Sequence, residues 1–282
     1  MHKHDRHVGF FGARGQELIS KERVAVVGCG GLGNHAVPQL VCLGVQEIIG
    51  IDDEHLSETN RNRYTLARHS DPAPGTHKVD IAQRVVKDLD TDVVFTPVKA
   101  SLRPAQVLEQ LRRATTIFGC VDNEGSRLVL MEFACAHRIP YFDLATDIPP
   151  GDALNFGGRV ALVNQRPGCL VCMDLLDMAE ARADLESESA RLDRERIYGV
   201  EKSDLSTSGP SVVSLNGVVA SLAVTEFIMH VTALRAPAQQ LSYRGRTGVV
   251  TRSTPPAAAA DCYYCCNVKG AGDKAGLGRY VG

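Results

Sequence analysis

The residues that could do chemistry begin with a glycine-rich turn, which follows the apolar run 24–27 and opens a helical stretch. Its glycines are Gly28, Gly30, Gly31 and Gly33. Glycine lets the backbone approach a phosphate closely, and a helix N-terminus offers free N–H groups and the positive end of a dipole. Asp52 follows the next apolar strand, 47–51, at a spacing suited to holding a ribose hydroxyl. This pattern predicts a nucleotide-binding site.

Three polar side chains after Asp52 narrow the class of nucleotide: Asn60, Arg63 and Lys78. A dinucleotide oxidoreductase needs the glycines and the acid but has no obvious use for these three groups. A triphosphate carries several negative charges that must be held while a phosphoryl bond breaks. Each cation alone is more often a solvated surface residue, and the turn alone could lack a ligand. Together they favour ATP, and the oxidoreductase stays as an alternative.

An acid and an amide, Asp122 and Asn123, follow another apolar strand at 116–120. A carboxylate at the carboxyl end of a strand lies where open α/β sheets bind ligands. Asp122 is therefore a candidate ligand for Mg²⁺, which would bridge phosphate oxygens. The alternative is that Asp122 caps the helix that starts near Gly125. Beside a triphosphate site, the magnesium role is favoured.

Four of the nine cysteines form a second constellation, independent of the nucleotide motif. They are two CxxC pairs, Cys169 with Cys172 and Cys262 with Cys265. Four thiolates at this spacing suit tetrahedral Zn²⁺, and two such pairs are more often a closed structural site than a redox site. Cys266 is a spare thiol or a substitute ligand.

The N-terminus has no apolar signal segment, so we expect a cytoplasmic protein whose thiols stay reduced. Disulfides are therefore a poor explanation for the cysteines. Those that lie within apolar strand or helix patterns are predicted to be small buried hydrophobes: Cys29, Cys42, Cys120 and Cys135.

Strand and helix patterns alternate around the nucleotide motif. Strands are predicted at 24–27, 47–51, 93–98, 116–120 and 140–144, and helices follow at 33–43, 78–89, 104–112 and 125–137. This order predicts a Rossmann-like α/β fold with a mostly parallel sheet flanked by helices.

The second half changes character. It shows a short strand at 160–163, a polar stretch at 178–208, a long apolar helix at 211–234 and an antiparallel strand pair at 241–243 and 248–251. The polar stretch is expected to be a mobile crossover loop with some helix. One domain, 1–282, is predicted, with an N-terminal arm at 1–20, a nucleotide-binding half at 21–150, a second half at 151–266 and a flexible tail at 267–282.

Composition sets bounds on the function. At 282 residues and 44% hydrophobic content, the chain can bury a full core. The net charge of −2 argues against a broad nucleic-acid surface. The apolar helix contains Asn216, Glu226 and His230, whose burial in lipid would be costly, so we expect a buried or interface helix and no membrane association.

Taken together, the motifs resemble the ThiF/MoeB/HesA superfamily, the bacterial relatives of ubiquitin-activating enzymes. The resemblance runs from about Arg6 to Cys265 and rests on GCGGLG, Asp52 with Asn60-x-x-Arg63, Lys78, and Asp122-Asn123. It implies an adenylyltransferase that uses ATP and Mg²⁺ and has a structural Cys₄ zinc site. It also implies that the second half, 151–266, binds the carrier and forms the dimer.

The resemblance further implies a role for each motif residue. The glycine turn and Asp52 hold the adenosine, and Glu54 takes the place of a second family acid. The phosphates are held by Asn60, Arg63 and Lys78, and the magnesium ion by Asp122.

Arg6 lies where the family has an arginine that reaches into the partner subunit's site, which implies a homodimer. Without the resemblance, Arg6 would be an exposed residue on a frayed terminus.

The implied reaction is adenylation of the C-terminal carboxylate of a ubiquitin-like or sulfur-carrier protein ending in Gly-Gly, with release of pyrophosphate. Many relatives place a catalytic cysteine in the crossover loop, but 202–210 contains none, which puts a thioester step in doubt. The alternatives are a peptide or tRNA-base acceptor, an NAD-dependent oxidoreductase, and an inactive carrier-binding scaffold.

Overall fold

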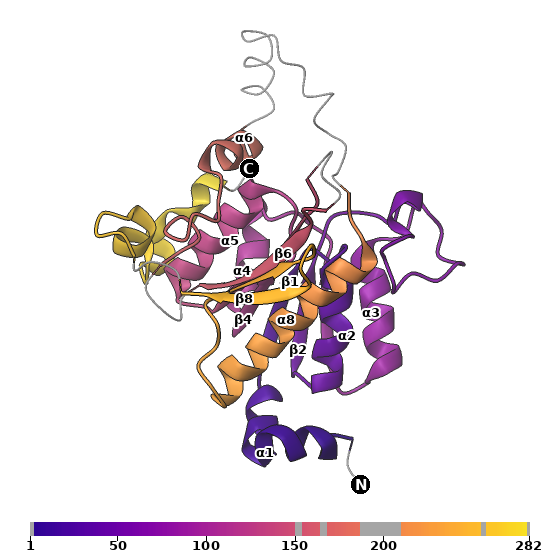
Figure 1. Ribbon diagram of the computed structural model, residues 1–282. Helices are drawn as coiled ribbons and strands as arrows, with labels where there is room; N and C mark the ends of the chain where they lie inside the picture. The colour runs from indigo at the N-terminus through magenta and orange to yellow at the C-terminus, as the bar shows by residue number, and fades with distance from the viewer. Residues whose placement is uncertain (1–2, 150–153, 164–167, 187–209, 255–257, 281–282) are drawn as a thin grey trace.

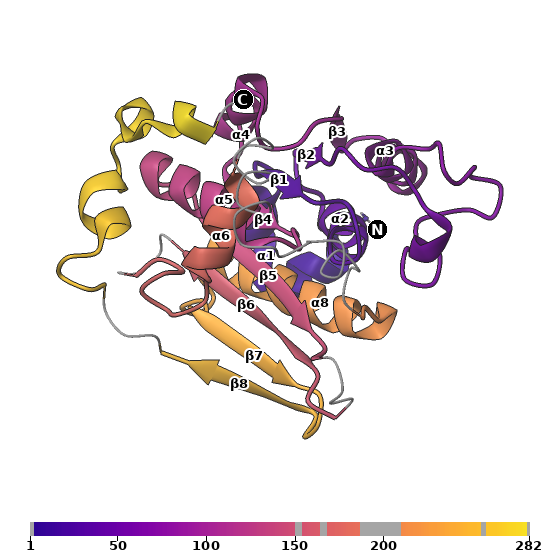
Figure 2. The same ribbon diagram turned by 90° about the horizontal axis from the view of Figure 1, so that it is seen from above.

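The computed structural model describes residues 3–149, 154–163, 168–186, 210–254 and 258–280. Within them one sheet has the strand order β3-β2-β1-β4-β5-β6-β7-β8 (Figures 1 and 2). Its strands are β1 Arg23–Val27, β2 Glu47–Ile51, β3 Val94–Val98, β4 Thr116–Gly119, β5 Tyr141–Asp147, β6 Gly157–Val163, β7 Gln240–Arg244 and β8 Val249–Ser253. Strands β1 to β5 run parallel, and β6 to β8 extend the sheet antiparallel. The predicted Rossmann-like α/β fold is confirmed.

Helices cover both faces of the sheet. The first face carries α1 Asp5–Ile19, α2 Gly33–Leu43, α3 Lys78–Leu89 and α8 Val213–Thr232. The second carries α4 Ala105–Arg112, α5 Glu124–His137 and α6 Met178–Leu185. Parallel strands covered on both faces read as continuous apolar runs. Accordingly, Val24 and Val26 of β1 pack into the first core, and Ala25 and Val27 pack into the second.

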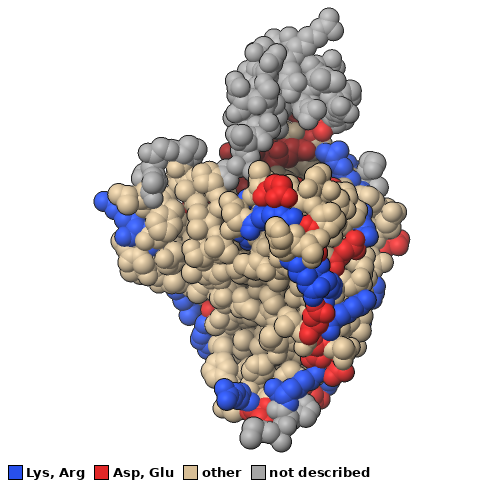
Figure 3. Space-filling view, turned by 90° about the vertical axis from the view of Figure 1, so that its right-hand side faces the viewer, with Lys and Arg blue, Asp and Glu red and all other residues tan. Residues whose placement is uncertain are grey.

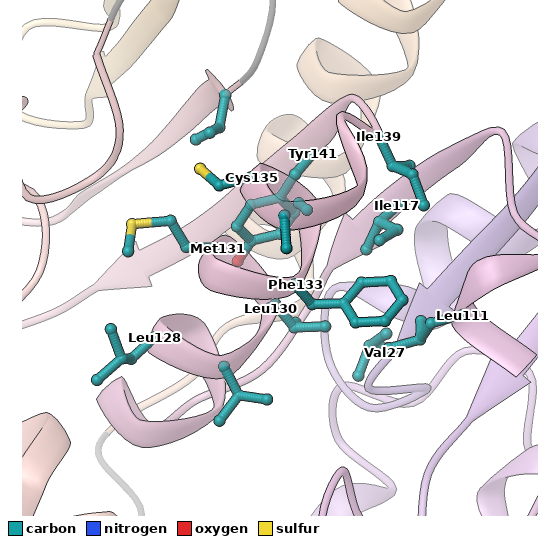
Figure 4. Close-up of a cluster of buried hydrophobic side chains, with 14 of the residues drawn as sticks. Val27, Leu111, Ile117, Leu128, Leu130, Met131, Phe133, Cys135, Ile139 and Tyr141 are labelled. Atoms are coloured by element: carbon teal, nitrogen blue, oxygen red, sulfur yellow. The ribbon is translucent and has the colours of Figure 1, made fainter. Parts of the chain in front are cut away.

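The second core is centred on α5, whose side chains pack against the parallel strands. Figure 4 shows Phe133 of α5 beside Val27 of β1 and Leu111 of α4. The three side chains are almost fully buried. This packing fixes α5, and its N-terminus follows the loop that carries Asp122.

Helix α8 is long and apolar enough to cross a membrane by length and composition, but it is a core helix of this fold. Half of its most apolar window is buried within the chain, where it packs on α1, α2, β5 and β6. Glu226 accepts bonds of 2.6 and 2.8 Å from Arg235 and one of 2.7 Å from the Ala238 backbone N–H. The helix therefore has the buried position that its polar residues predicted.

Several strands are longer than the sequence indicated, and β5 and β6 each extend three residues past a predicted end. β5 and β6 pair over seven residues each, from Tyr141↔Val163 to Asp147↔Gly157. The polar and glycine residues at their ends hide the extension from an apolar pattern. Of the polar stretch 178–208, residues 178–185 form α6, and 187–208 lie outside the described residues.

The C-terminal segment, for which the sequence predicted a flexible tail at 267–282, has secondary structure within 264–280. It forms the short helices η3 Tyr264–Val268, η4 Gly272–Ala275 and η5 Leu277–Tyr280, which pack on α5. Glu132 of α5 is fully buried and ion-paired with Arg279, and the Tyr280 hydroxyl donates to it at 2.7 Å. A buried carboxylate needs such partners, and this long-range requirement is absent from the local glycine-rich pattern.

Arg279→Met should lower the free energy of unfolding by about 1–3 kcal/mol, because Glu132 would keep one partner and stay buried. Chemical denaturation of both proteins measures the difference. Arg112→Met is the matched control. It breaks an exposed ion pair with Asp273 in the same tail and should cost less than about 0.5 kcal/mol. Equal losses in the two variants would contradict a special role for the buried carboxylate.

Candidate nucleotide cleft and cysteine cluster

A cavity of about 830 Å³ opens at the carboxyl ends of the parallel strands. It brings together nearly every residue that the sequence singled out for the nucleotide. Those that line it are Gly28, Gly30, Gly31, Asp52, Asn60, Arg63, Lys78, Asp122 and Asn123. Gly33 is not among the lining residues and begins α2 behind the turn. The volume falls in the range of small-molecule and cofactor sites.

The glycine turn is shaped by two close approaches. Gly28 has φ of +89°, and a Cβ atom there would lie 2.5 Å from the Cys120 carbonyl oxygen. At Gly31 a Cβ atom would lie 2.7 Å from Asn216 Nδ2. A side chain at either position would therefore displace the turn or its neighbours. Asn216, on α8, lines the cleft and was not singled out from the sequence.

Asn34, also missed, ties the turn to the loop that carries Arg63. Its buried side-chain amide donates to the carbonyl oxygens of Gly30 at 2.8 Å and Gly31 at 2.6 Å. Its Oδ1 accepts from the Thr65 backbone N–H at 3.0 Å and from the Thr65 hydroxyl at 2.7 Å. Its position directly after the last glycine was the only signal available in the sequence.

Asp52 is fixed at the end of β2 by two backbone donors. Oδ2 accepts from the Cys29 N–H at 2.7 Å, and Oδ1 accepts from the Glu54 N–H at 2.8 Å. Burial raises the pKa of Asp52 to about 6, against the opposing effects of Lys78 and of the two backbone donors. Asp52 therefore changes charge within the range of ordinary buffers.

Lys78 and Arg63, the cations of the cleft, are positioned by an ion pair and by hydrogen bonds to the surrounding loop. Lys78, the first residue of α3, is only 6% exposed in its side chain and is ion-paired with Glu54, whose side chain is 63% exposed. Its carbonyl oxygen accepts from the buried Tyr64 hydroxyl at 3.1 Å. Arg63 donates to the Thr59 carbonyl oxygen at 2.6 Å. Lys78 is thus a nearly buried cation whose counter-ion is free to leave into water.

The loop after β4 leaves Asp122 free. Asn123, rather than Asp122, caps α5 by accepting from the Ser126 N–H at 2.8 Å. Asp122 is exposed in the cleft and has no hydrogen bond within the described residues. The capping alternative for Asp122 is therefore wrong, and its carboxylate is available to a cation.

A buried charge network lies under this loop, and sequence reasoning missed it. Arg127 donates to the Val121 carbonyl oxygen at 2.8 Å and to Asp143 Oδ1 at 2.6 Å. Asp143 has no exposed surface, and its other oxygen accepts from Arg159 at 3.2 Å. Tyr141 also donates to Asp143 at 3.0 Å. The network holds the backbone one residue before Asp122.

The two CxxC pairs meet in space, although 89 residues separate Cys172 from Cys262. The Sγ–Sγ distances are 3.8 Å for Cys169–Cys172, 3.7 Å for Cys169–Cys262 and 3.8 Å for Cys172–Cys265. Four sulfurs around a tetrahedral ion with bonds near 2.3 Å lie about 3.8 Å apart. The cluster therefore fits a metal ion.

The other cysteines lie outside this cluster. Cys266 is exposed, and its thiol donates to the Ala260 carbonyl oxygen at 3.3 Å, so Cys265 is the fourth member. Cys29, Cys120 and Cys135 are buried as predicted. The same prediction for Cys42 is wrong: it is exposed because it lies on the outer side of α2, where the apolar pattern continues past the core.

Arg6 is exposed on α1 and is not among the residues that line the cleft of its own chain. Helix α1 packs against α8 and α2 (Figure 1). Thus Arg6 does not complete the site within one chain.

An open α/β sheet with a glycine turn after its first strand, an acid at the end of the next strand and cations in the same cleft defines a Rossmann-like nucleotide-binding fold. Residues 4–265 match the ThiF family, and the chain belongs to that family. The resemblance seen in the sequence motifs is confirmed.

Curated relatives share part of the chain. The SAMP-activating enzyme E1 of Haloferax volcanii is 31% identical over 140 residues, which are 49% of this chain and 51% of the relative. The molybdopterin-synthase adenylyltransferase of Escherichia coli is 29% identical over 164 residues, 57% of this chain and 62% of the relative. The matched region is therefore less than two thirds of either relative.

Solved structures share the fold at lower identity. E. coli MccB with ATP has a TM-score of 0.71 and 18% identity, and the match covers 94% of this chain and 74% of that chain. PaaA has a TM-score of 0.66 and 17% identity, with 89% and 81% covered. At these identities the likeness supports the fold alone.

Adenosine affinity should rise between about pH 5 and pH 7 with a midpoint near the Asp52 pKa of about 6. The charged carboxylate accepts bonds from ribose hydroxyls better than the neutral acid does. Isothermal titration calorimetry measures this, and adenosine has no phosphate that titrates in the same range. Asp52→Asn should bind adenosine weakly and equally at each pH, and an unchanged pH profile in Asp52→Asn would contradict the assignment.

The raised pKa also sets the sign of a stability effect. The folded state holds the Asp52 proton more tightly than the unfolded state, so Asp52 lowers the free energy of unfolding as pH rises from about 4 to 6. In Asp52→Asn this decrease in the free energy of unfolding between about pH 4 and pH 6 should be absent.

Proposed function

We propose that this protein is an ATP-dependent adenylyltransferase that activates the C-terminal carboxylate of a ubiquitin-like or sulfur-carrier protein. The observation that carries the proposal is the single cleft that holds the glycine turn, Lys78 and an unengaged Asp122. The names of the curated relatives support the same class of reaction.

In the proposed reaction a carboxylate oxygen attacks the α-phosphorus of ATP, the bond from that phosphorus to the bridging oxygen breaks, and pyrophosphate leaves. Both anionic reactants must be held together, so positioning and charge neutralisation are the protein's main tasks. Lys78, Arg63 and Asn60 bind the phosphates, and the glycine turn with Asp52 orients the adenosine. Asp122 would hold Mg²⁺, which supplies further positive charge to the phosphate oxygens when bound.

The cations also favour the adenylyltransferase over the alternative of an oxidoreductase. Lys78, Arg63 and Asn60 line the same cleft as Asp52. A dinucleotide cofactor needs the glycine turn and Asp52 but leaves these three groups without a function. No acyl–enzyme step is proposed, because the loop sequence 202–210 has no cysteine; 202–209 lie outside the described residues.

ATP–pyrophosphate exchange tests the activity. We expect exchange that depends on a small carrier ending in Gly-Gly and is lost when the carrier lacks those two residues. Asp122→Ala should lower the exchange rate by about 100-fold or more, because Mg²⁺, whose positive charge offsets that of the phosphates, would lose its protein ligand. Asp53→Ala, an exposed acid of the same cleft, should keep exchange. Tight NAD binding without ATP binding, or full exchange by Asp122→Ala, would refute the proposal.

We further propose a homodimer in which Arg6 of one subunit reaches the cleft of the other. The outward faces of α2 and α8 support an interface between copies, because neither helix carries an exposed charge. α2 has no charged residue, and the only one in α8, Glu226, is buried. Figure 3 shows a broad area without charges beside a band of charged side chains.

Mixing two inactive variants tests Arg6 in trans. Arg6→Ala and Asp122→Ala should each lack exchange activity. After subunit exchange, half the dimers are mixed and each of these has one intact site, so about a quarter of all sites should be active. Arg14→Ala, on the same helix, is the control and should be active alone. Exchange that stays absent after mixing, with mixed dimers present, contradicts action in trans.

For the cysteine cluster we propose structural Zn²⁺, which would tie the C-terminal segment to the segment after β6. Purified protein should contain about one zinc per chain, measured by mass spectrometry of the metal. Cys265→Ser should lose zinc and unfold at lower temperature, because a ligand is removed. Cys266→Ser is the matched neighbour and should keep both. Zinc loss from Cys266→Ser, with Cys265→Ser unaffected, would reverse the assignment.

A further inference from the structure

A second cavity, of about 470 Å³, lies beside the nucleotide cleft on the antiparallel part of the sheet. The two cavities adjoin, because Asp147 at the end of β5 lines both. The second cavity is formed by the ends of β5, β6 and β7, by Phe156 before β6, and by the turn after β7. Nothing in the proposed binding of ATP uses it.

Most of the charged side chains that line this cavity are cationic. Its charged lining residues are three arginines, Arg159, Arg244 and Arg246, against one acid, Asp147. Arg244 and Arg246 are exposed and have no ion pair within the described residues. Arg159 is anchored by Asp143 at 3.2 Å and by the Leu175 carbonyl oxygen at 2.7 Å. Its Nε is buried and has no hydrogen-bond acceptor in the part of the chain that is described.

Two glycines of β6 line the cavity at positions that have no room for a side chain. A Cβ atom at Gly157 would lie 2.4 Å from the Tyr243 carbonyl oxygen, and one at Gly158 would lie 2.4 Å from a Val219 methyl. Phe156 is held over the turn by a 2.8 Å bond from the Gly245 N–H to its carbonyl oxygen. Phe156 and the three arginines therefore line the same recess.

We propose that this recess binds acidic side chains of the acyl substrate, a few residues before the carboxylate that enters the cleft. The inference rests on the proposed function and adds a rule for choosing the substrate protein. Asp147 would repel a carboxylate placed beside it, which directs the acidic side chains toward the three arginines. Guanidinium groups pair well with carboxylates, and charge complementarity of this kind selects partners and speeds their association.

The sheet register gives the spacing. Asp147 pairs with Gly157, which pairs with Arg244, so Arg244 lies two strands from the shared boundary. Two interstrand steps are about 10 Å, a distance that an extended peptide crosses in about three residues. With up to three further residues between Asp147 and the reacting carboxylate, the acidic side chains are proposed to lie about three to six residues before the C-terminus.

Binding of two synthetic peptides, measured by fluorescence anisotropy without ATP, tests this rule. Both end in Gly-Gly, and the positions three to six residues before the end are Glu in one and Gln in the other. The protein should bind the Glu peptide roughly tenfold more tightly. The variant with Arg244→Glu and Arg246→Glu should lose this preference. Arg252→Glu, on the same hairpin but outside the cavity, should keep it.

Equal affinity for the two peptides, or loss of the preference in Arg252→Glu, would overturn the proposal. The proposal would also be overturned if a single-stranded RNA of equal charge bound through Arg244 and Arg246 and the Glu peptide did not bind. Asp122→Ala separates this inference from the proposed function, because it should lose exchange activity and keep the peptide preference. If exchange is absent from the unmodified protein and the preference remains, the adenylation proposal fails and the acidic-peptide site stands.

Discussion

The contact between Gly28 and the carbonyl oxygen of Cys120 determines how the rest of the cleft is arranged. It joins the end of β1 to the end of β4 with no room for a side chain. The turn that follows Gly28 leads into α2, and Asp122 comes two residues after Cys120. One backbone contact therefore sets the separation between the glycine turn and Asp122. A side chain at position 28 would widen this separation whatever the other cleft residues were.

Local patterns in the sequence were enough to predict the parallel half of the fold. β2 and α3 begin and end at the residues that the apolar spacing indicated, because both are regular and covered by apolar neighbours. The nucleotide residues were also found from sequence, since each follows a strand at the same edge of the sheet. Their roles as ATP ligands stay predictions, as do the domain ranges and the cytoplasmic location.

What the sequence did not reveal depends on partners far along the chain. Asn216 is 185 residues from Gly31, and Asp143 receives one arginine from α5 and another from β6. Neither pairing produces a hydrophobic periodicity or a short motif in the sequence. The contacts of the tail were not predicted for the same reason, because its glycines indicate disorder and give no sign of the ion pair between Arg279 and the buried Glu132. Cys42 shows the opposite error, in which a local apolar pattern extends beyond the surface that is covered.

Burial of Asp143 and Glu132 costs free energy, which their ion-pair partners offset. Removing Asp143 and Glu132 from water is unfavourable, and apolar residues of similar size would pack at least as well. Asp143 binds Arg127, which lines the nucleotide cleft, and Arg159, which lines the adjoining cavity. The carboxylate therefore fixes the relative position of two guanidinium groups in neighbouring cavities. An apolar residue would fill the same volume without fixing either one.

The Lys78–Glu54 pair explains how the cleft can hold a nearly buried cation before ATP arrives. Lys78 is shielded from water, so it needs an anion beside it whether or not a ligand is present. Glu54 supplies that anion from an exposed position, and its carboxylate is readily hydrated when it leaves. In the proposed function, a phosphate that binds Lys78 replaces one anion by another, without a stage in which the ammonium group is buried alone. The desolvation cost of Lys78 is met when the protein folds, and the affinity for the phosphate is reduced only by the cost of displacing Glu54.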